Sequence, residues 1–236
     1  MATILHIETS TDICSVALSK DGMVLHDNVI GSNAEHHSQA SEQLGSMVDE
    51  AMTVLEDQKL KLDAVAVSAG PGSYTGLRIG VSMAKGIAYG SDARLIAIPT
   101  LELLCVAPLL KGLPSHSPLL CPMIDARRME VYAAIYDASL KIVRQPQSDI
   151  VDAEIYKQYL DEQPVFFFGN GAAKCIEVIN HPNAHFIPNI QTLAKNMMPL
   201  AEKRYYNSQF EDVAYFTPDY MKVYQAKLPK NLLKIN

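Results

Sequence analysis

The chain has 236 residues, a formal net charge of −6 and 48% hydrophobic residues. This length can form one large domain or two small ones, and the acidic balance excludes a broad basic footprint for nucleic acid, so that any RNA contact has to be local or supplied by a partner. No apolar run is long enough to cross a membrane, and the N-terminus lacks the basic region and apolar core of a signal peptide. The cysteines show no CxxC spacing, so we expect buried thiols and a cytoplasmic protein.

Three antiparallel strands are predicted at the start of the chain. Residues 3–8 form an apolar run that ends at Glu8, and a polar turn follows. Residues 13–19 alternate between large apolar and small side chains, as a half-buried strand does. Asp21-Gly22 is a strong hairpin signal, so the chain returns as a third strand over residues 23–30.

A long amphipathic helix is predicted over residues 36–56, because its apolar side chains fall within about a third of the circumference. A short buried strand (64–68), a glycine turn (70–73) and a second helix (75–90) come next. Small residues recur every four positions along that helix, so another backbone can approach it closely. The ridge consists of Gly76, Gly80, Ala84 and Ala88.

The glycine turn allows two interpretations. A strand, a glycine turn and a helix N-terminus can bind an anion through free N–H groups and the helix dipole, which would make Gly70, Gly72 and Ser73 a phosphate site. The turn is neither a Walker A loop nor a GxGxxG fingerprint. The alternative is a tight turn that uses glycine only for its backbone freedom.

The second half of the chain repeats the first. After a strand (94–98), a connecting helix (101–110) and a turn-rich linker (112–118), an apolar strand ends at Asp125 as the first strand ended at Glu8. The further predicted elements are strands at 131–136 and near 140–143, a helix at 152–161, a strand at 165–168, and a glycine turn opening a helix that reaches residue 179. We interpret this as a duplicated βββαβα unit whose second copy is shorter.

The repeat predicts an α/β protein with two lobes, residues 1–112 and 113–190. A last helix over 191–206 is expected to pack back on the first lobe. Residues 219–236 are expected to form a flexible tail, whose four lysines suit either a frayed terminus or a partner or tRNA-backbone contact.

Three ordered motifs within residues 1–140 resemble the TsaB (YeaZ) family. They are Ile7-Glu8-Thr9-Ser10, the run from Gly70 to Arg78 with Gly80, and Ile124-Asp125-Ala126-Arg127-Arg128 with Glu130-Val131-Tyr132. Near the end, Pro218-Asp219-Tyr220-Met221-Lys222 fits as well, although the family usually has Arg in place of Lys222.

The resemblance implies an actin/Hsp70/sugar-kinase-like (RNase H-like) fold with a reduced second lobe. It also implies a role in making threonylcarbamoyladenosine at position 37 of ANN-decoding tRNAs, as the non-catalytic partner of TsaD in a complex with the ATPase TsaE. A homodimer is expected when TsaD is absent, and tRNA is expected to be bound through the complex.

The catalytic relative carries an HxxxH metal pair, and here Thr100 and Leu104 stand at those two positions. Neither side chain can replace an imidazole ligand, so no metal site is expected. His36 and His37 lack a ligand partner four residues on, and are expected to be solvated. No catalytic residue is predicted.

Two binding surfaces are implied by the resemblance. Thr9 and Ser10, with Gly70, Gly72 and Ser73, resemble the phosphate-facing loops of the superfamily, so we expect weak ATP or ADP binding, or none. The first two long helices are expected to pair with those of TsaD, and the alternative is that the glycine ridge packs on the protein's own sheet. The expected contact residues are Leu44, Met47, Ala51, Gly76, Leu77, Gly80, Val81 and Ala84.

Two other functional classes compete with a scaffold subunit. An ATP-dependent small-molecule kinase of the same superfamily would need a catalytic Asp and a complete adenosine-binding lobe. A metalloprotease would need HExxH, which the sequence lacks, or HxxxH at the position of the catalytic relative's metal pair, where Thr100 and Leu104 stand.

Overall fold

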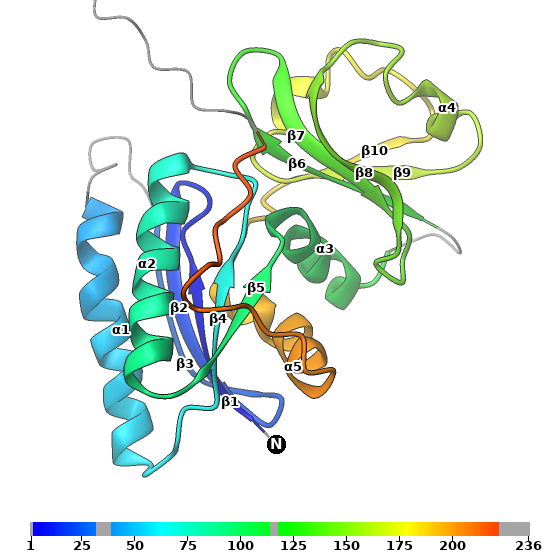
Figure 1. The fold of residues 1–236 in the computed structure, drawn as a ribbon. Coiled ribbons are helices and arrows are strands. Elements are labelled where there is room, and N and C mark those ends of the chain that lie inside the picture. The colour runs from blue at the N-terminus through cyan, green and yellow to red at the C-terminus, as the bar shows by residue number, and fades with distance from the viewer. Residues whose placement is uncertain (1, 32–38, 114–117, 222–236) are drawn as a thin grey trace, which may run out of the picture.

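The computed structural model describes residues 2–31, 39–113 and 118–221 (Figure 1). It contains two five-stranded sheets, one in each lobe. The first has the order β3-β2-β1-β4-β5 and the second the order β10-β9-β6-β7-β8. In each, three antiparallel strands are followed by two parallel ones. The two lobes therefore repeat one topology, which confirms the predicted duplication.

The first sheet consists of β1 (Thr3–Glu8), β2 (Ile13–Lys20), β3 (Met23–Gly31), β4 (Ala64–Ser68) and β5 (Arg94–Ile98). Its two faces bury alternate side chains, as the period of a strand requires. One face, with Leu5, Val16 and Val65, lies under α1 (Gln39–Asp57) and α2 (Tyr74–Gly90). The other, with Ile4 and Ala66, lies under η2 (Ala194–Met197) and α5 (Met198–Tyr206).

The second sheet consists of β6 (Leu119–Asp125), β7 (Glu130–Tyr136), β8 (Ile142–Ile150), β9 (Val165–Phe168) and β10 (Ala184–Ile187). The helices expected beside it are much shorter than predicted. The first is reduced to α4 (Lys157–Leu160), and the second to the single turn η1 (Ala173–Cys175). Strand β10 was not predicted, because its four residues follow a Pro-Asn turn and show no clear alternation.

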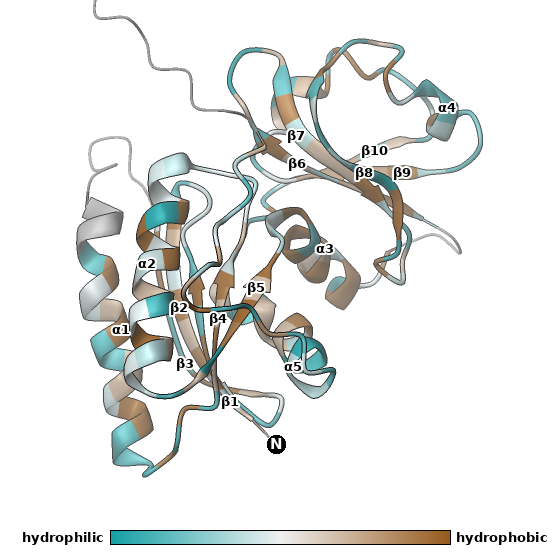
Figure 2. Ribbon diagram, viewed as in Figure 1, coloured by the Kyte–Doolittle hydropathy of each residue, from teal (hydrophilic) through white to brown (hydrophobic). Residues whose placement is uncertain are grey.

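Helix α3 (Thr100–Lys111) lies between the two sheets. Leu103 and Val106 pack on the first sheet, whereas Leu101, Leu104 and Cys105 pack on the second. A helix that is covered on both sides has to be apolar nearly all round, and Figure 2 shows the hydrophobic strands of both lobes on either side of it. This helix therefore joins the two cores.

The expected partner residues of α1 and α2 are buried within the first lobe. Leu44, Met47 and Ala51 on α1, and Leu77, Val81 and Ala84 on α2, are between 0 and 5% exposed. All but Leu77 belong to the cluster that covers the first sheet. The prediction that these side chains form an intermolecular contact is wrong, because the apolar stripe of each helix is used by the protein's own core.

A C-terminal strap, residues 211–221, runs from the open edge of β5 toward the space between the lobes (Figure 1). The N–H of Glu211 donates to the carbonyl of Leu95 (2.9 Å). Lys85 Nζ on α2 donates to two strap carbonyls, those of Ala214 (3.0 Å) and Phe216 (3.1 Å). The strap thus covers a sheet edge that would otherwise expose unpaired backbone groups.

Residues 219–221, expected to be part of a flexible tail, belong to the strap. The N–H of Asp219 donates to the carbonyl of Ala69 (2.8 Å), and the Tyr220 ring lies 4.6 Å from that of Tyr74. Residues 222–236 lie outside the described residues, as do His36, His37 and part of the 112–118 linker. Within the described part of the chain, none of the helices combines the length and apolarity needed to cross a bilayer.

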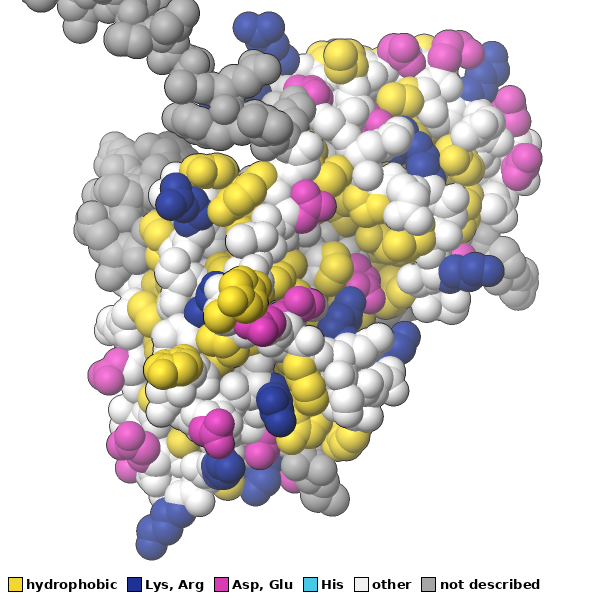
Figure 3. Space-filling view, in the orientation of Figure 1, with side chains coloured by type: hydrophobic (Ala, Val, Ile, Leu, Met, Phe, Trp, Pro, Cys, Tyr) yellow, Lys and Arg dark blue, Asp and Glu magenta, His cyan; other side chains and the backbone are white. Residues whose placement is uncertain are grey.

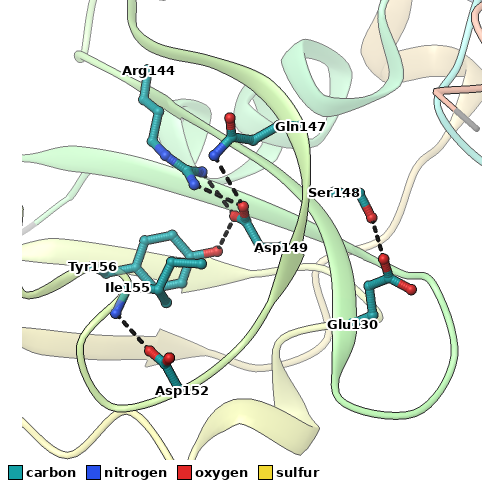
Figure 4. Close-up of polar contacts among 8 residues, drawn as sticks. All are labelled: Glu130, Arg144, Gln147, Ser148, Asp149, Asp152, Ile155 and Tyr156. Carbon is teal, nitrogen blue, oxygen red and sulfur yellow. Dashed lines mark hydrogen bonds and ion pairs between the residues drawn. The ribbon is translucent and has the colours of Figure 1, made fainter.

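A buried ion pair stabilises the second lobe (Figure 4). Arg144 forms two hydrogen bonds to Asp149, at 2.8 and 2.7 Å. The Tyr156 hydroxyl (2.6 Å) and the Gln147 amide (3.2 Å) also donate to this carboxylate. Four donors satisfy the carboxylate of Asp149, a residue that is 2% exposed, and the bond from Tyr156 fastens the end of β8 to the residue before α4.

Candidate functional site

The two lobes enclose a hollow of about 930 Å³. The first lobe contributes the turn after β1 and the start of α2, and the strap contributes Tyr220. The second lobe contributes the hairpin between β6 and β7 and the loop after β9. The lining residues are Ser10, Thr11, Asp12, Gly72, Ser73, Tyr74, Thr75, Ile124, Asp125, Ala126, Arg127, Tyr132, Asn170 and Tyr220.

The two loops that resemble phosphate-binding loops are bonded to each other. The N–H of Ser73 donates to the carbonyl of Ser10 (2.7 Å), and the Thr9 hydroxyl donates to the carbonyl of Gly76 (2.8 Å). Ser73 Oγ accepts a hydrogen bond from the Gly76 N–H (3.2 Å), so it caps α2. The Ser73 N–H and the Thr9 hydroxyl are therefore already occupied by protein acceptors.

The glycines of this region admit the protein's own backbone. A Cβ on Gly72 would overlap the carbonyl of Ser10, and a Cβ on Gly76 would overlap that of Thr9. A Cβ on Gly80 would overlap the Thr9 hydroxyl. Gly76 and Gly80 of the small-residue ridge thus receive the turn after β1, so this part of the ridge packs within the protein.

Gly70 is the position that needs glycine for its backbone conformation. Its φ of +98° lies in the region that side chains rarely adopt, and a Cβ there would overlap the carbonyl of Asp219. The glycine turn is therefore packed against the strap on one side and against Ser10 on the other.

Glu8, at the end of β1, is fully buried beside this turn. Its Oε1 accepts hydrogen bonds from the Ser10 N–H (2.6 Å) and the Ser10 hydroxyl. Burial, which disfavours the charged form, raises the pKa of this carboxyl from 4.5 to about 7. The sequence marked Glu8 only as the end of a strand, although an acid that directly follows a buried run is a usable signal.

Asp125 occupies the equivalent position in the second lobe but is half exposed. Its carboxylate pairs with Lys174, and its N–H donates to the Asn170 side chain (3.0 Å). Asp125 also accepts a hydrogen bond from the N–H of Arg127 (3.1 Å). This bond holds the hairpin tip, where Arg127 and Arg128 both adopt positive φ angles of 72° and 45°.

Comparison with known proteins identifies the family. The family model described as TsaD, tRNA N6-adenosine threonylcarbamoyltransferase, matches residues 29–230. The chain belongs to the TsaD family. The Bacillus subtilis protein named tRNA threonylcarbamoyladenosine biosynthesis protein TsaB is 28% identical to this chain, over 95% of this chain and 96% of that protein. The relative of that name in Haemophilus influenzae is 31% identical over 68% of this chain and 63% of the relative.

Solved structures agree on the fold. YeaZ from Pseudomonas aeruginosa has a TM-score of 0.74 with 24% identity, over 93% of this chain and all of that one. The named relatives and the family model make the chain a TsaB (YeaZ) type member of the TsaD family. The fold is that of YeaZ, and its two copies of one sheet topology agree with the predicted duplicated α/β architecture.

Thr100 and Leu104, which stand where the resemblance places a metal pair in the catalytic relative, do not fit a metal in this chain. Leu104 packs in the apolar cluster between α3 and the second sheet, and Thr100 is fully buried. In the described part of the chain, no three His, Cys, Asp or Glu side chains are grouped as metal ligands. A hydroxyl and an isobutyl group cannot replace two imidazoles.

Proposed function

We propose that this chain is a non-catalytic subunit that acts beside a TsaD-type protein in the biosynthesis of threonylcarbamoyladenosine in tRNA. The names of its relatives and the matching family model support the pathway. The observation that carries the non-catalytic role is the bond between Ser73 and Ser10, which closes the two loops that would hold a phosphate. The apolar packing of Leu104 supports the same conclusion.

Nucleotide binding by the isolated chain is proposed to be weak or absent. Thr9, Ser10 and Ser73 use their hydrogen-bonding groups within the protein. The second lobe, whose helices are reduced to α4 and η1, offers little surface to grip a nucleoside. For the same reasons we do not propose an ATP-dependent kinase, and no observation favours a metalloprotease.

The proposed contact with TsaD uses the outward faces of α1 and α2, which lie side by side on the first sheet (Figure 1). These faces lie on the sides of the two helices opposite the buried apolar stripes described above. The same faces could pair two copies of this chain when TsaD is absent, since like surfaces can form a twofold contact. Their exposed residues include Ser46, Asp49, Thr53, Arg78, Ser82, Gly86 and Tyr89.

Contact with tRNA is proposed to occur through the complex, in the cytoplasm. On the face shown in Figure 3, the Lys and Arg side chains of the described residues are dispersed among acidic ones. Such a surface lacks the concentrated positive charge that binds a phosphate backbone by itself.

Reconstitution tests this function. The chain is mixed with TsaD, TsaE, threonylcarbamoyl-adenylate and an ANN-decoding tRNA, and modified adenosine is measured with each protein omitted in turn. We expect modification to require this chain together with TsaD. Modification by this chain without TsaD would contradict the non-catalytic role, and full modification without this chain would contradict the subunit role.

The contact surface is tested by Ser82→Arg, which places a bulky charge on the exposed face of α2. An unpaired charge in an interface costs several kcal/mol, so we expect TsaD binding to weaken by roughly 100-fold or more. Ala138→Arg, in the exposed turn after β7, is the control and should bind normally. Equal binding by both variants would exclude this face of α2.

A further inference from the structure

Glu8 lies where the chain returns from the second lobe to the first. Residues 188–193, the crossing segment, run from β10 to η2. The Thr192 hydroxyl bonds to that of Thr11 (2.9 Å), and the N–H of Ala194 donates to Ser15 Oγ (2.9 Å). Ser15 is the β2 residue directly opposite Glu8 in the sheet. The crossing segment is therefore attached to the first lobe around Glu8.

The two oxygens of the Glu8 carboxyl differ in their surroundings. Oε1 accepts both hydrogen bonds from Ser10, whereas Oε2 is buried without a hydrogen-bond partner among the described residues. The hydroxyls of Ser68 and Thr192 lie near enough to favour the ionised carboxyl and so lower its pKa, against the larger effect of burial, but neither makes a well-formed bond to Oε2. A proton on Oε2 would turn this unsatisfied acceptor into a donor facing two hydroxyl oxygens.

Among the described ionisable groups around Glu8, no other buried group changes its charge near neutral pH. Among the described residues of the surrounding strands and turn, these groups are His6, Cys14 and Asp12. Burial lowers the pKa of His6 to about 3 and raises that of Cys14 to about 11, with the Glu8 charge as a second cause for Cys14. Asp12 is exposed. The crossing segment and β4 carry no ionisable side chain, and Glu102 near the start of α3 pairs with Arg204.

We propose that Glu8 is a proton-operated latch between the two lobes. In the protonated state the carboxyl donates to the Thr192 hydroxyl and fastens the crossing segment to the end of β1. In the ionised state only neutral groups of the described residues face the carboxylate, so the buried charge is relieved when the crossing segment loosens and water enters. Fastening of the crossing segment is thereby coupled to the uptake of one proton, and its loosening to the release of that proton.

Hydrogen–deuterium exchange tests the latch in the full chain. Exchange of residues 188–197 is measured at pH 6 and pH 8 and corrected for the intrinsic pH dependence of amide exchange. A carboxyl with a pKa near 7 is ionised roughly tenfold more at pH 8 than at pH 6, so the corrected exchange should rise by up to about tenfold. Glu8→Gln keeps an acceptor and supplies a permanent donor, and should exchange slowly at both pH values.

Glu162→Gln, an exposed position in the second lobe, is the matched control and should behave like the unmodified chain. If Glu8→Gln does not fold by circular dichroism, Thr192→Val provides the test. Removing the hydroxyl on the crossing segment should give fast exchange at both pH values. The same pH dependence in the unmodified chain and in the folded variant would overturn the latch.

Discussion

The N–H of Ser73 donates to the carbonyl of Ser10 across 2.7 Å and joins the start of α2 to the turn after β1. The resemblance seen in the sequence implied that these two loops would face a phosphate. Here they face each other, and the glycines of α2 permit the close approach. An internal contact thus lies where the sequence allowed a ligand contact.

Gly76→Ala should destabilise the first lobe. The added methyl group overlaps the carbonyl of Thr9, and overpacking of this kind costs about 1–3 kcal/mol. Gly86, on the same helix, has no atom near its Cβ position, so Gly86→Ala should instead stabilise by up to about 1 kcal/mol. Urea unfolding of both variants measures the difference, and a shift of the same sign in both would contradict the packing described for Gly76.

Nucleotide binding should be undetectable or weak by calorimetry with ATP or ADP and magnesium. The reason is that the donors of Ser73 and Thr9 are already bonded within the protein. We expect a dissociation constant of about 1 mM or weaker, which corresponds to roughly 4 kcal/mol of binding free energy. Binding at micromolar concentration would show that the loops separate and would revive the phosphate-site interpretation.

The stability of the protein should depend on pH through Glu8 with a defined sign. The folded state holds the Glu8 proton up to about pH 7 and the unfolded chain releases it near pH 4.5. Folding is therefore favoured below pH 4.5, and this contribution, about 3 kcal/mol, is lost as the pH rises to 7. His6 acts in the opposite direction, because its pKa of about 3 in the fold means that stability is lost as the pH falls below 6.5.

These opposing effects are separated by comparing the unmodified chain with Glu8→Gln. The stability of the variant relative to the unmodified chain should increase by about 1.4 kcal/mol per pH unit between pH 4.5 and 7, because only the unmodified chain carries the titrating group. Urea unfolding at half-unit pH steps measures this slope. A constant difference would mean that Glu8 has the same pKa in the folded and unfolded states.

Asp149→Ala should destabilise the second lobe strongly. It leaves the Arg144 guanidinium and the Tyr156 hydroxyl without their acceptor in a buried site, and breaking a buried ion pair costs about 3–5 kcal/mol. The exposed pair of Glu154 and Lys157 offers a comparison: Lys157→Ala should cost less than about 1 kcal/mol. Similar losses in the two variants would show that the Asp149 network contributes little.

Much of the architecture was predictable because it depends on local patterns. The strands at 3–8, 64–68 and 165–168 are compact apolar runs, and all three appear with those boundaries. The recurrence of an acid at the end of a strand, at Glu8 and Asp125, revealed the duplication. The shortening of the helices of the second lobe was harder to predict, because a helical pattern over 152–161 does not reveal whether packing will support more than one turn.

The sequence by itself determined the order of the strands and helices except β10, and the duplicated topology, since these follow from periodicity and turn chemistry. Its three motifs indicated the family. Only the tertiary structure decided which way the small-residue ridge of α2 faces, that Gly70 receives Asp219 from the strap, and that Glu8 is buried beneath the crossing segment. The physical reason is that the period of a helix shows which residues share a face, but not which element packs against that face. Contacts between residues more than sixty positions apart depend on how the whole chain packs.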